Sequence, residues 1–191
     1  MIEDGELILQ LQNGSLEALG KLYDKHQRMV YRTALVITGD TDAAADLLQD
    51  VFLRLYRFSS HIDPQRPIEP WLYRMTANQS YTWVKRSKRW LRPLEEVAEW
   101  LVGTRRSSTQ ANVIDEDWVQ VQQAVSALPL PQRVVVVLYY LNDLSLQEIA
   151  DILDVPVETV KSRLHYGREA LRKHLTASQN EKFSDLKCEF T

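Results

Sequence analysis

Apolar residues recur every three or four positions along most of the chain, a spacing typical of amphipathic helices. A proline-containing loop, "SSHIDPQRP", follows Phe58, and Gly39 and Asp40 interrupt the helical period earlier in the chain. The first half therefore predicts four helices, at 2–12, 15–38, 41–58 and 71–90. Within the third of these, one side is apolar, and we expect its residues Leu47, Val51 and Leu55 to be buried.

The second half is denser in apolar residues. It predicts one helix at 115–128 and another from Pro131, although the four valines of "PLPQRVVVVLYYL" favour a strand by intrinsic propensity. A short helix follows, with Ser145 and Glu148 as an S-x-x-E capping box. A three-residue turn then leads to a longer helix at Pro156, because a proline loses no hydrogen bond in a first helical turn.

In this longer helix, Val160, Leu164 and Leu171 lie on the side predicted to be buried, and the opposite side is polar and basic. A short helix, a turn and a longer helix with a basic face are typical of a helix-turn-helix, whose second helix enters the major groove of DNA. The alternative interpretation is a fragment of an ordinary helical bundle.

The segments outside these helices set the domain boundaries. Residues 92–113 lose the helical period and end in a Ser/Thr-rich run, which indicates a linker. Residues 176–191 are polar with scattered apolar positions, and we expect them to form a disordered tail. The sequence therefore predicts an all-α protein with two small helical domains, 1–91 and 114–175, joined by a flexible linker.

Charge is unevenly distributed over a chain whose formal net charge is −3. The segment 71–92 carries six basic residues and no acid, and the segment 161–173 carries five basic residues and one acid. Basic segments of this kind indicate binding to a polyanion even in an acidic protein. The acidic remainder is compatible either with a basic protein partner or with ordinary solvated surface.

Several functional classes are excluded by the sequence. No apolar run approaches the ~20 residues that span a bilayer, and the N-terminus lacks the features of a signal peptide, so we expect a cytoplasmic protein without membrane insertion. The single Cys188 forms no internal disulfide. His165 and His174 lack a ligand partner at metal-binding spacing, and the acidic run at 115–117 points around a helix. We therefore expect no catalytic residue, no metal, no cofactor and no enzymatic activity.

The motifs of the two halves together resemble a known family. "LPLPQRVVVVLYYLNDLSLQEIADILDVPVETVKSRLHYGREALRKHL" is similar to region 4 of bacterial RNA polymerase sigma factors of the extracytoplasmic-function (ECF) group. "DAAADLLQDVFLRLYR" followed by "WLYRMTANQSYTWVKR" is similar to their region 2, and the resemblance covers about residues 15–175. LuxR-type regulators share much of the region 4 motif, so a stand-alone helix-turn-helix regulator is the alternative. The region 2 motif favours the sigma factor.

The resemblance implies three sets of contacts. On the helix "ADLLQDVFLRLYR", the residues expected to bind the β′ clamp helices of core RNA polymerase are Asp46, Gln49, Asp50, Phe52, Arg54 and Arg57. Asn78 is expected to hold a flipped base of the −10 element beside the specificity loop 60–69, and the −10 set is Ile62, Asn78, Trp83, Lys85, Arg86, Lys88 and Arg89. The residues expected to read the −35 element are Thr159, Lys161, Ser162, Arg163, His165, Tyr166 and Arg168.

The same resemblance implies further partners. This chain also departs from the family pattern at positions that bear on promoter sequence, so no known promoter consensus is carried over. The β flap of core polymerase, promoter DNA and an anti-sigma factor, often membrane-anchored, are the expected partners. Thr82 stands where the family often has Asp, Tyr166 stands where Arg is common, and the specificity loop carries Ile62, Pro64 and Pro67. The residues leave open whether Trp71 and Trp83 pack in the core or stack on DNA bases.

Overall fold

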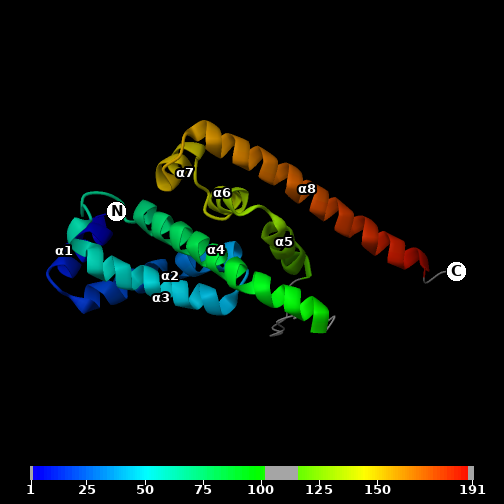
Figure 1. The fold of residues 1–191 in the computed structure, drawn as a ribbon. Coiled ribbons are helices and arrows are strands. Elements are labelled where there is room, and N and C mark those ends of the chain that lie inside the picture. The colour runs from blue at the N-terminus through cyan, green and yellow to red at the C-terminus, as the bar shows by residue number, and fades with distance from the viewer. Residues whose placement is uncertain (1, 102–115, 189–191) are drawn as a thin grey trace.

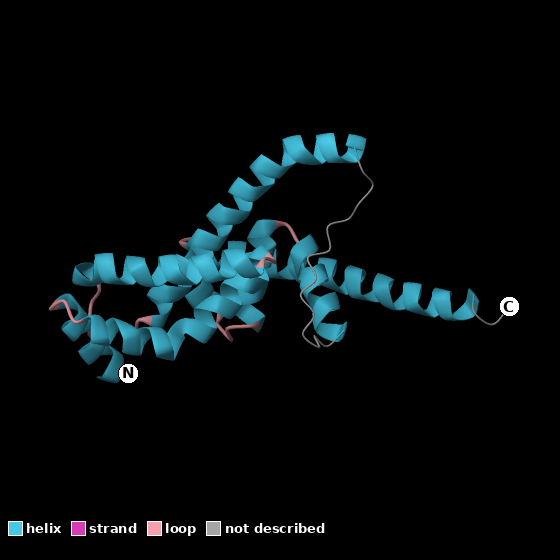
Figure 2. Cartoon of the chain, turned by 90° about the horizontal axis from the view of Figure 1, so that it is seen from below, coloured by secondary structure: helices cyan, strands magenta, loops and turns pink. Residues whose placement is uncertain are grey.

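The computed structural model describes the backbone of residues 2–101 and 116–188, and the side chains of residues 4–87 and 120–176. These residues form helices and no strand (Figures 1 and 2). The helices are α1 (Ile2–Gln12), α2 (Leu16–Thr38), α3 (Thr41–Phe58), the 3-10 turn η1 (Ser59–His61), α4 (Glu69–Leu101), α5 (Glu116–Ala127), α6 (Leu130–Tyr140), α7 (Leu146–Leu153) and α8 (Val157–Cys188). The all-α prediction is confirmed, including the helix at the valine run.

Capping residues set the ends of the helices as the sequence predicts. Ser15 accepts a hydrogen bond from the Ala18 amide at the start of α2, and Asp40 accepts one from the Ala43 amide at the start of α3. Between them, Gly39 adopts a left-handed conformation with φ of 73° and its amide donates to the Leu35 carbonyl. This short connection turns α3 back onto α2.

Two predicted boundaries differ from the structure. The helix α4 continues to Leu101, past the expected domain end at residue 91, because residues 94–101 are mostly strong helix formers. The helix α8 continues to Cys188, where a disordered tail was expected from residue 176, because residues 168–188 contain neither Gly nor Pro. The linker residues 102–113 lie outside the described residues, and so do residues 189–191.

Two main hydrophobic clusters hold the fold together. The first lies among α1, α2, α3 and α4, and its fully buried members include Ile8, Leu22, Val51, Leu55 and Leu72. The expected burial of Leu47, Val51 and Leu55 is confirmed. The second cluster lies among α5, α6, α7 and α8 and contains the buried residues Val135, Leu138, Ile149, Val160 and Leu164.

The second cluster also contains residues of the first half, which joins the two halves into one body. Val36, Ile37 and Ala77 are buried in it. A close approach supports the packing of α6 on α8, because a Cβ added at Gly167 would lie 2.7 Å from Cγ2 of Val136. No helix in the described ranges is both long enough and apolar enough to cross a membrane.

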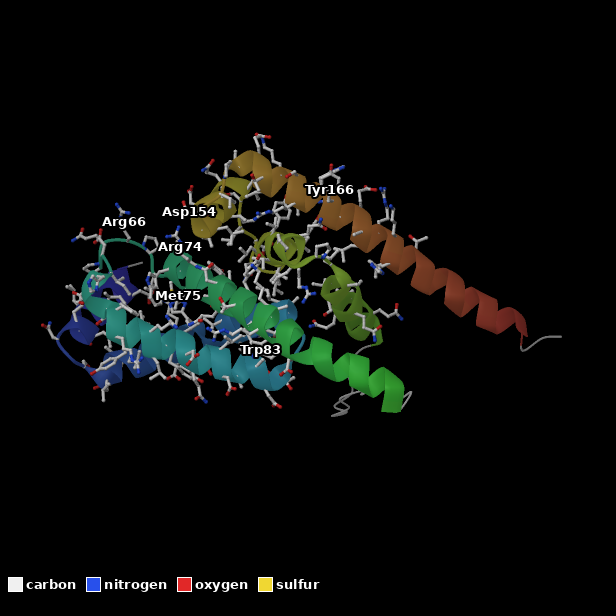
Figure 3. The ribbon with its side chains drawn as sticks, in the orientation of Figure 1. Arg66, Arg74, Met75, Trp83, Asp154 and Tyr166 are labelled. Carbon is white, nitrogen blue, oxygen red and sulfur yellow. The ribbon has the colours of Figure 1, made fainter. Side chains whose placement is uncertain are left out.

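Polar contacts cross the same boundary. The Arg74 guanidinium on α4 donates to the carbonyls of Ile152 (2.9 Å) and Asp151 (2.6 Å) in α7, so that it caps the C-terminus of that helix. Asn142 donates to the Thr33 hydroxyl at 3.0 Å. Figure 3 shows Arg74 on α4 facing the end of α7, close to Asp154. The two predicted domains therefore pack directly against each other.

Candidate polymerase and DNA interfaces

The polar residues predicted on α3 lie on its solvent side. This exposed set is Asp46, Gln49, Asp50, Arg54 and Arg57. Phe52 is different: it is 4% exposed and packs edge-on against Tyr23, with ring centroids 4.9 Å apart. The prediction that Phe52 projects toward a partner is corrected by this packing, because its place on the helix faces the first core.

Sequence analysis missed the apolar residues of the same surface. Leu53 is 51% exposed, and Tyr56 and Phe58 also lie open to solvent. We call Leu53, Tyr56 and the exposed polar residues of α3 the α3 face. Since solvent-exposed apolar residues that adjoin charged ones are frequent at protein interfaces, the α3 face suits a protein partner. Leu53 directly follows Phe52, and placing Phe52 on the buried side of the helix would have placed Leu53 on the exposed side.

The α3 face is linked to α4 through a side-chain contact. With the amide oxygen of Gln79 turned toward α3, that oxygen accepts hydrogen bonds from the Arg54 guanidinium, one of them at 3.1 Å from Nη2. Gln79 follows Asn78 on α4, so Arg54 bridges the predicted polymerase surface to the helix that carries the predicted base-capturing residue.

The helix α1 supports the predicted specificity loop, residues 60–69, through Gln12 and Gly5. The Gln12 amide donates to the carbonyls of Ser59 and Ile62, both at 2.9 Å. Gly5 packs against the Pro64 carbonyl so closely that an added Cβ would clash with it. Ile62 is buried in the first cluster, which corrects the expectation that its side chain faces DNA. Its apolar side chain anchors the loop instead.

On α4, the residues predicted to meet the −10 strand are largely accessible. Asn78, Lys85 and Arg86 are exposed, and Lys85 lies over the Tyr81 ring at 4.6 Å from its centroid. The Thr82 hydroxyl donates to the backbone carbonyl of Asn78 at 2.8 Å, and the Asn78 residue itself is exposed. The side chains of Lys88 and Arg89 lie outside the described residues.

Both tryptophans left open by the sequence pack in this structure. Trp83 lies half-buried against the small cluster formed by Ala34, Ala44 and Leu47. Trp71 packs against the first cluster. Figure 3 places Trp83 on α4, well along the helix from Arg74.

A groove of about 590 Å³ opens between the specificity loop, the start of α4 and α7. Its lining includes His61, Arg66, Trp71, Arg74 and Glu148. Beside it, burial raises the pKa of Tyr73, and the Glu69 carboxylate raises it further. The helix α7 and Leu144 therefore form one wall of the groove beside residues 61–67.

The helix-turn-helix has the local geometry that the sequence predicts. The Ser145 amide donates to the Glu148 carboxylate at 2.8 Å, and the Glu148 amide donates to the Ser145 hydroxyl at 3.3 Å, which completes the capping box. The hydrogen bond that the Ser145 hydroxyl donates to the Glu148 carboxylate at 2.6 Å, together with the one from the Ser145 amide, lowers the pKa of Glu148. Asp154 adopts a left-handed conformation with φ of 54°, which turns the chain from α7 into α8.

The predicted −35 residues fall into three groups on α8. Thr159 and Arg163 are half-buried, and the exposed Lys161 pairs with Glu158 at 2.6 Å. The exposed Ser162 donates to the Thr159 carbonyl at 3.0 Å. The remaining three, His165, Tyr166 and Arg168, are exposed, and the Arg168 guanidinium lies 5.4 Å from the Tyr139 ring centroid. Figure 3 shows Tyr166 on the outer side of α8.

Each half of the chain matches a model of a known protein family. The chain matches the family model for Sigma-70 region 2 over residues 22–90 and the model for Sigma-70, region 4 over residues 118–171. It is similar to the ECF RNA polymerase sigma factor SigW of Bacillus subtilis (strain 168), with 35% identity over 176 residues that cover 88% of this chain and 94% of SigW. It is also similar to the ECF sigma factor SigL of Mycobacterium tuberculosis (strain ATCC 25618 / H37Rv), with 33% identity over 153 residues that cover 79% of this chain and 85% of SigL.

Solved structures agree on the fold. The structure of CnrH in complex with the cytosolic domain of CnrY superposes with a TM-score of 0.67 at 23% identity, and covers 92% of this chain and 98% of that one. The sigma factor RpoE in complex with the anti-sigma factor NepR from Bartonella quintana also gives 0.67, at 18% identity, and covers 84% and 98%. The two family models and the relatives thus identify a transcription initiation factor of the sigma-70 type, and its fold is shared with these solved structures. Within that class, the chain belongs to the ECF group of RNA polymerase sigma factors.

Proposed function

We propose that this sigma factor, acting in the cytoplasm, docks on core RNA polymerase through the α3 face and reads promoters with α4 and α8. The polymerase carries out the chemistry, and this chain acts as a binding subunit. The observation that carries the proposal is the order of three exposed surfaces on one chain: a mixed apolar and charged face on α3, a basic amide-bearing face on α4, and a polar helix-turn-helix face on α8.

Each surface suits a different target. The exposed Leu53 and Tyr56 beside charged residues suit a protein partner such as the β′ clamp helices. The α8 face carries Tyr166 and Arg168, which suit base edges and phosphates of duplex DNA in the major groove. The exposed Asn78 offers both an amide donor and an acceptor to an unstacked base of the opened −10 strand.

In the packed arrangement, part of the α4 surface is engaged with region 4. Arg74 is bonded to α7, Ala77 is buried in the second cluster, and Tyr73 and Tyr81 pack against that cluster. Since the −10 and −35 elements are separated along the promoter, both readers can be occupied together only after the two halves move apart. We infer that polymerase binding stabilises the separated state, which requires an affinity difference between the two states. The free protein should therefore bind promoter DNA poorly.

A protein inhibitor of the anti-sigma class could act on the same equilibrium between the packed and the separated arrangement. CnrH and RpoE were solved with CnrY and NepR, respectively, and their fold is shared by this chain. An anti-sigma factor that favours the packed arrangement would keep Arg74 bonded to α7 and leave the promoter-reading surfaces apart from their targets. The β flap is expected to receive region 4 in the active complex.

Run-off transcription with purified core polymerase on genomic fragments tests this proposal. We expect start sites that appear only when both core enzyme and this chain are present. Tyr56→Ala should abolish co-migration with core polymerase on a native gel, whereas Asn78→Ala should retain co-migration and lose initiation. Transcription that needs a second sigma factor would instead support a stand-alone regulator, and loss of core binding in Asn78→Ala would refute the assigned division of roles.

A further inference from the structure

Three side chains that could bind a metal ion converge where α1, α2 and α4 meet. Asp4 comes from α1, His26 from α2, and Glu69 is the first residue of α4. One ligand atom from each lies within 4.8 Å of the others. Asp4 is 5% exposed, His26 is 6% exposed, and Glu69 is half-buried. Spacing along the sequence predicted no metal site, because these residues are far apart in the chain.

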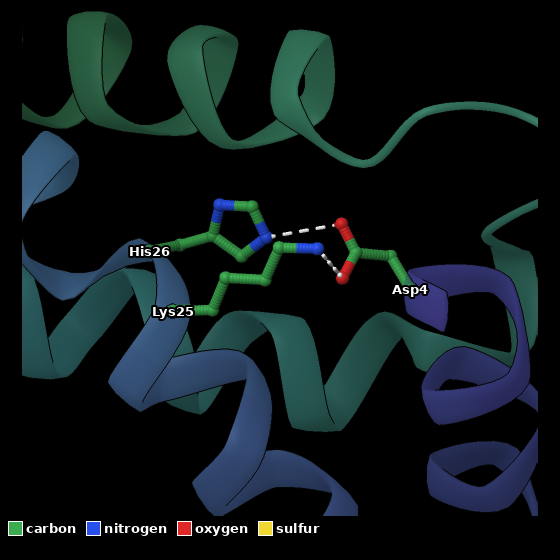
Figure 4. A network of polar contacts seen from close by, with 3 residues as sticks. All are labelled: Asp4, Lys25 and His26. Carbon is green, nitrogen blue, oxygen red and sulfur yellow. Dashed lines mark hydrogen bonds and ion pairs between the residues drawn. The ribbon is translucent and has the colours of Figure 1, made fainter. Parts of the chain in front are cut away.

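The geometry of the buried pair already matches metal coordination. Nε2 of His26 lies 3.2 Å from Oδ2 of Asp4 (Figure 4). Two ligand atoms on one tetrahedral Zn²⁺ ion, at bond lengths of about 2.0–2.1 Å, are themselves about 3.3 Å apart. This separation equals one edge of a coordination tetrahedron, and the imidazole and the carboxylate would have to turn so that both face one ion instead of each other. Among the described residues, the Glu69 carboxylate makes no hydrogen bond or ion pair and interacts electrostatically with Tyr73, so it is available to move inward as the third ligand.

Lys25 lies beside these three residues, and its ammonium group competes with a metal ion for the Asp4 carboxylate. Its ammonium nitrogen is 2.6 Å from Oδ1 of Asp4, the oxygen that does not face His26 (Figure 4). The Lys25 side chain is 41% exposed, so it can turn toward solvent without loss of core packing. Burial raises the pKa of Asp4, but the hydrogen bond from Lys25 and the charges of His26 and Lys25 lower it below its ordinary value overall. Lys25 and a metal ion would therefore compete for the Asp4 carboxylate.

We propose that Oδ2 of Asp4, Nε2 of His26 and the carboxylate of Glu69 form a binding site for a divalent transition-metal ion of the Zn²⁺ type. One imidazole nitrogen with two carboxylate oxygens suits Zn²⁺, whereas Mg²⁺ and Ca²⁺ prefer sites made of oxygen alone. Three protein ligands leave a coordination position for water or for an incoming group. The proposal is independent of the promoter-reading function, which needs no metal.

The position of the site gives it a consequence for promoter reading. The same helix α1 that supplies Asp4 supports the specificity loop through Gln12 and Gly5, and Glu69 is the last residue of that loop and the first of α4. A metal ion bound by Asp4 and Glu69 would therefore tie both sides of the loop to His26 on α2. Metal occupancy would restrain the loop that adjoins the −10 strand.

Titration of the untagged, full-length, metal-free protein with Co²⁺ tests the site, because Co²⁺ ligated by nitrogen and oxygen gives visible absorption bands. We expect bands that Zn²⁺ removes by displacement. Glu69→Gln and His26→Gln should each weaken Co²⁺ binding by at least about tenfold, as expected for loss of one ligand. Lys25→Met should tighten it, because the competing ammonium is gone. His174→Gln, which changes an exposed histidine in region 4, is the matched control and should leave the bands unchanged.

A second readout separates a defined site from adventitious binding. Zn²⁺ should slow amide hydrogen exchange in residues 59–68 of the wild type and leave it unchanged in Glu69→Gln. Glu69 is only half-buried, so this variant keeps the test decisive even if the buried His26 variant fails to fold. Absence of bands in the wild type, Co²⁺ binding by Glu69→Gln as tight as by the wild type, bands lost in His174→Gln, or weaker binding by Lys25→Met would each overturn the proposal. Run-off transcription without added metal reports on the proposed function separately.

Discussion

Arg133 provides a direct test of how the two halves are held together. Its guanidinium is 3% exposed. It donates to the Ile37 carbonyl at 2.8 Å, to the Leu128 carbonyl at 3.2 Å and to the Ser126 carbonyl. Ile37 lies in the last turn of α2, and Ser126 and Leu128 lie at the end of α5. One cation therefore caps two helices, one from each half, whose terminal carbonyls have no partner within their own helix.

Replacing Arg133 with Met keeps the length of the apolar stem and removes all three contacts. Each buried carbonyl left without a donor costs about 1–3 kcal/mol. Against this, the guanidinium no longer has to be buried, which relieves a desolvation cost of several kcal/mol. Burial lowers the pKa of Arg133, which reflects that cost, but an arginine stays charged at any pH of interest. We expect a net loss of roughly 2–4 kcal/mol in the free energy of unfolding.

Urea denaturation of the full-length chain, followed by circular dichroism, measures this change by linear extrapolation. Arg172→Met makes the same replacement at an exposed arginine that pairs with Glu169, and it should change stability by less than about 0.5 kcal/mol. A fluorophore pair placed on the two halves should report their separation in Arg133→Met. A variant as stable as the wild type, with unchanged transfer efficiency, would show that Arg133 does not hold the halves together.

Other positions give further tests. Asn78→Ala should lower open-complex formation, measured by permanganate footprinting, by roughly 5- to 150-fold, on the basis of about 1–3 kcal/mol for a base contact, without changing the unfolding midpoint. Ser145→Ala should destabilise the chain by about 1 kcal/mol in urea, since it removes the cap of α7. Glu148→Gln should be less stable than the wild type at pH 7; because the folded pKa of Glu148 lies below 4.5, this difference should shrink as the pH falls through that value. Gly167→Ala should lower the thermal midpoint, because the added methyl group meets Val136; an unchanged midpoint would mean that α6 and α8 adjust freely.

Local features of the fold could be predicted from the sequence because they depend on neighbouring residues. The capping box at Ser145, the glycine at position 39 and the spacing of Leu47, Val51 and Leu55 each act within a few positions. The wrong prediction at Phe52 also concerns neighbouring residues in the sequence. Both Phe52 and Leu53 are apolar, and the pattern alone did not decide which of the two completes the buried side.

Contacts between distant residues could not be predicted in this way. Nothing in the sequence around Ala77 indicates that it is buried with Val135 and Leu138, and the bond from Arg74 to Ile152 joins positions 78 apart. The prediction of two domains on a flexible linker assumed that each half has a hydrophobic core of its own, without residues from the other half. The apolar residues Val36 and Ile37 satisfied the helical pattern of α2, but the pattern gave no indication of the surface they cover.

That shared cluster has a thermodynamic consequence. Since residues of both halves contribute to one core, the isolated protein should unfold in a single cooperative transition, even though it matches two separate family domains. Separation of the halves uncovers Val36, Ile37 and Ala77, so the step should carry a positive heat-capacity change. Activation by polymerase should then depend on temperature, with a strength set by how much of this apolar surface the polymerase covers.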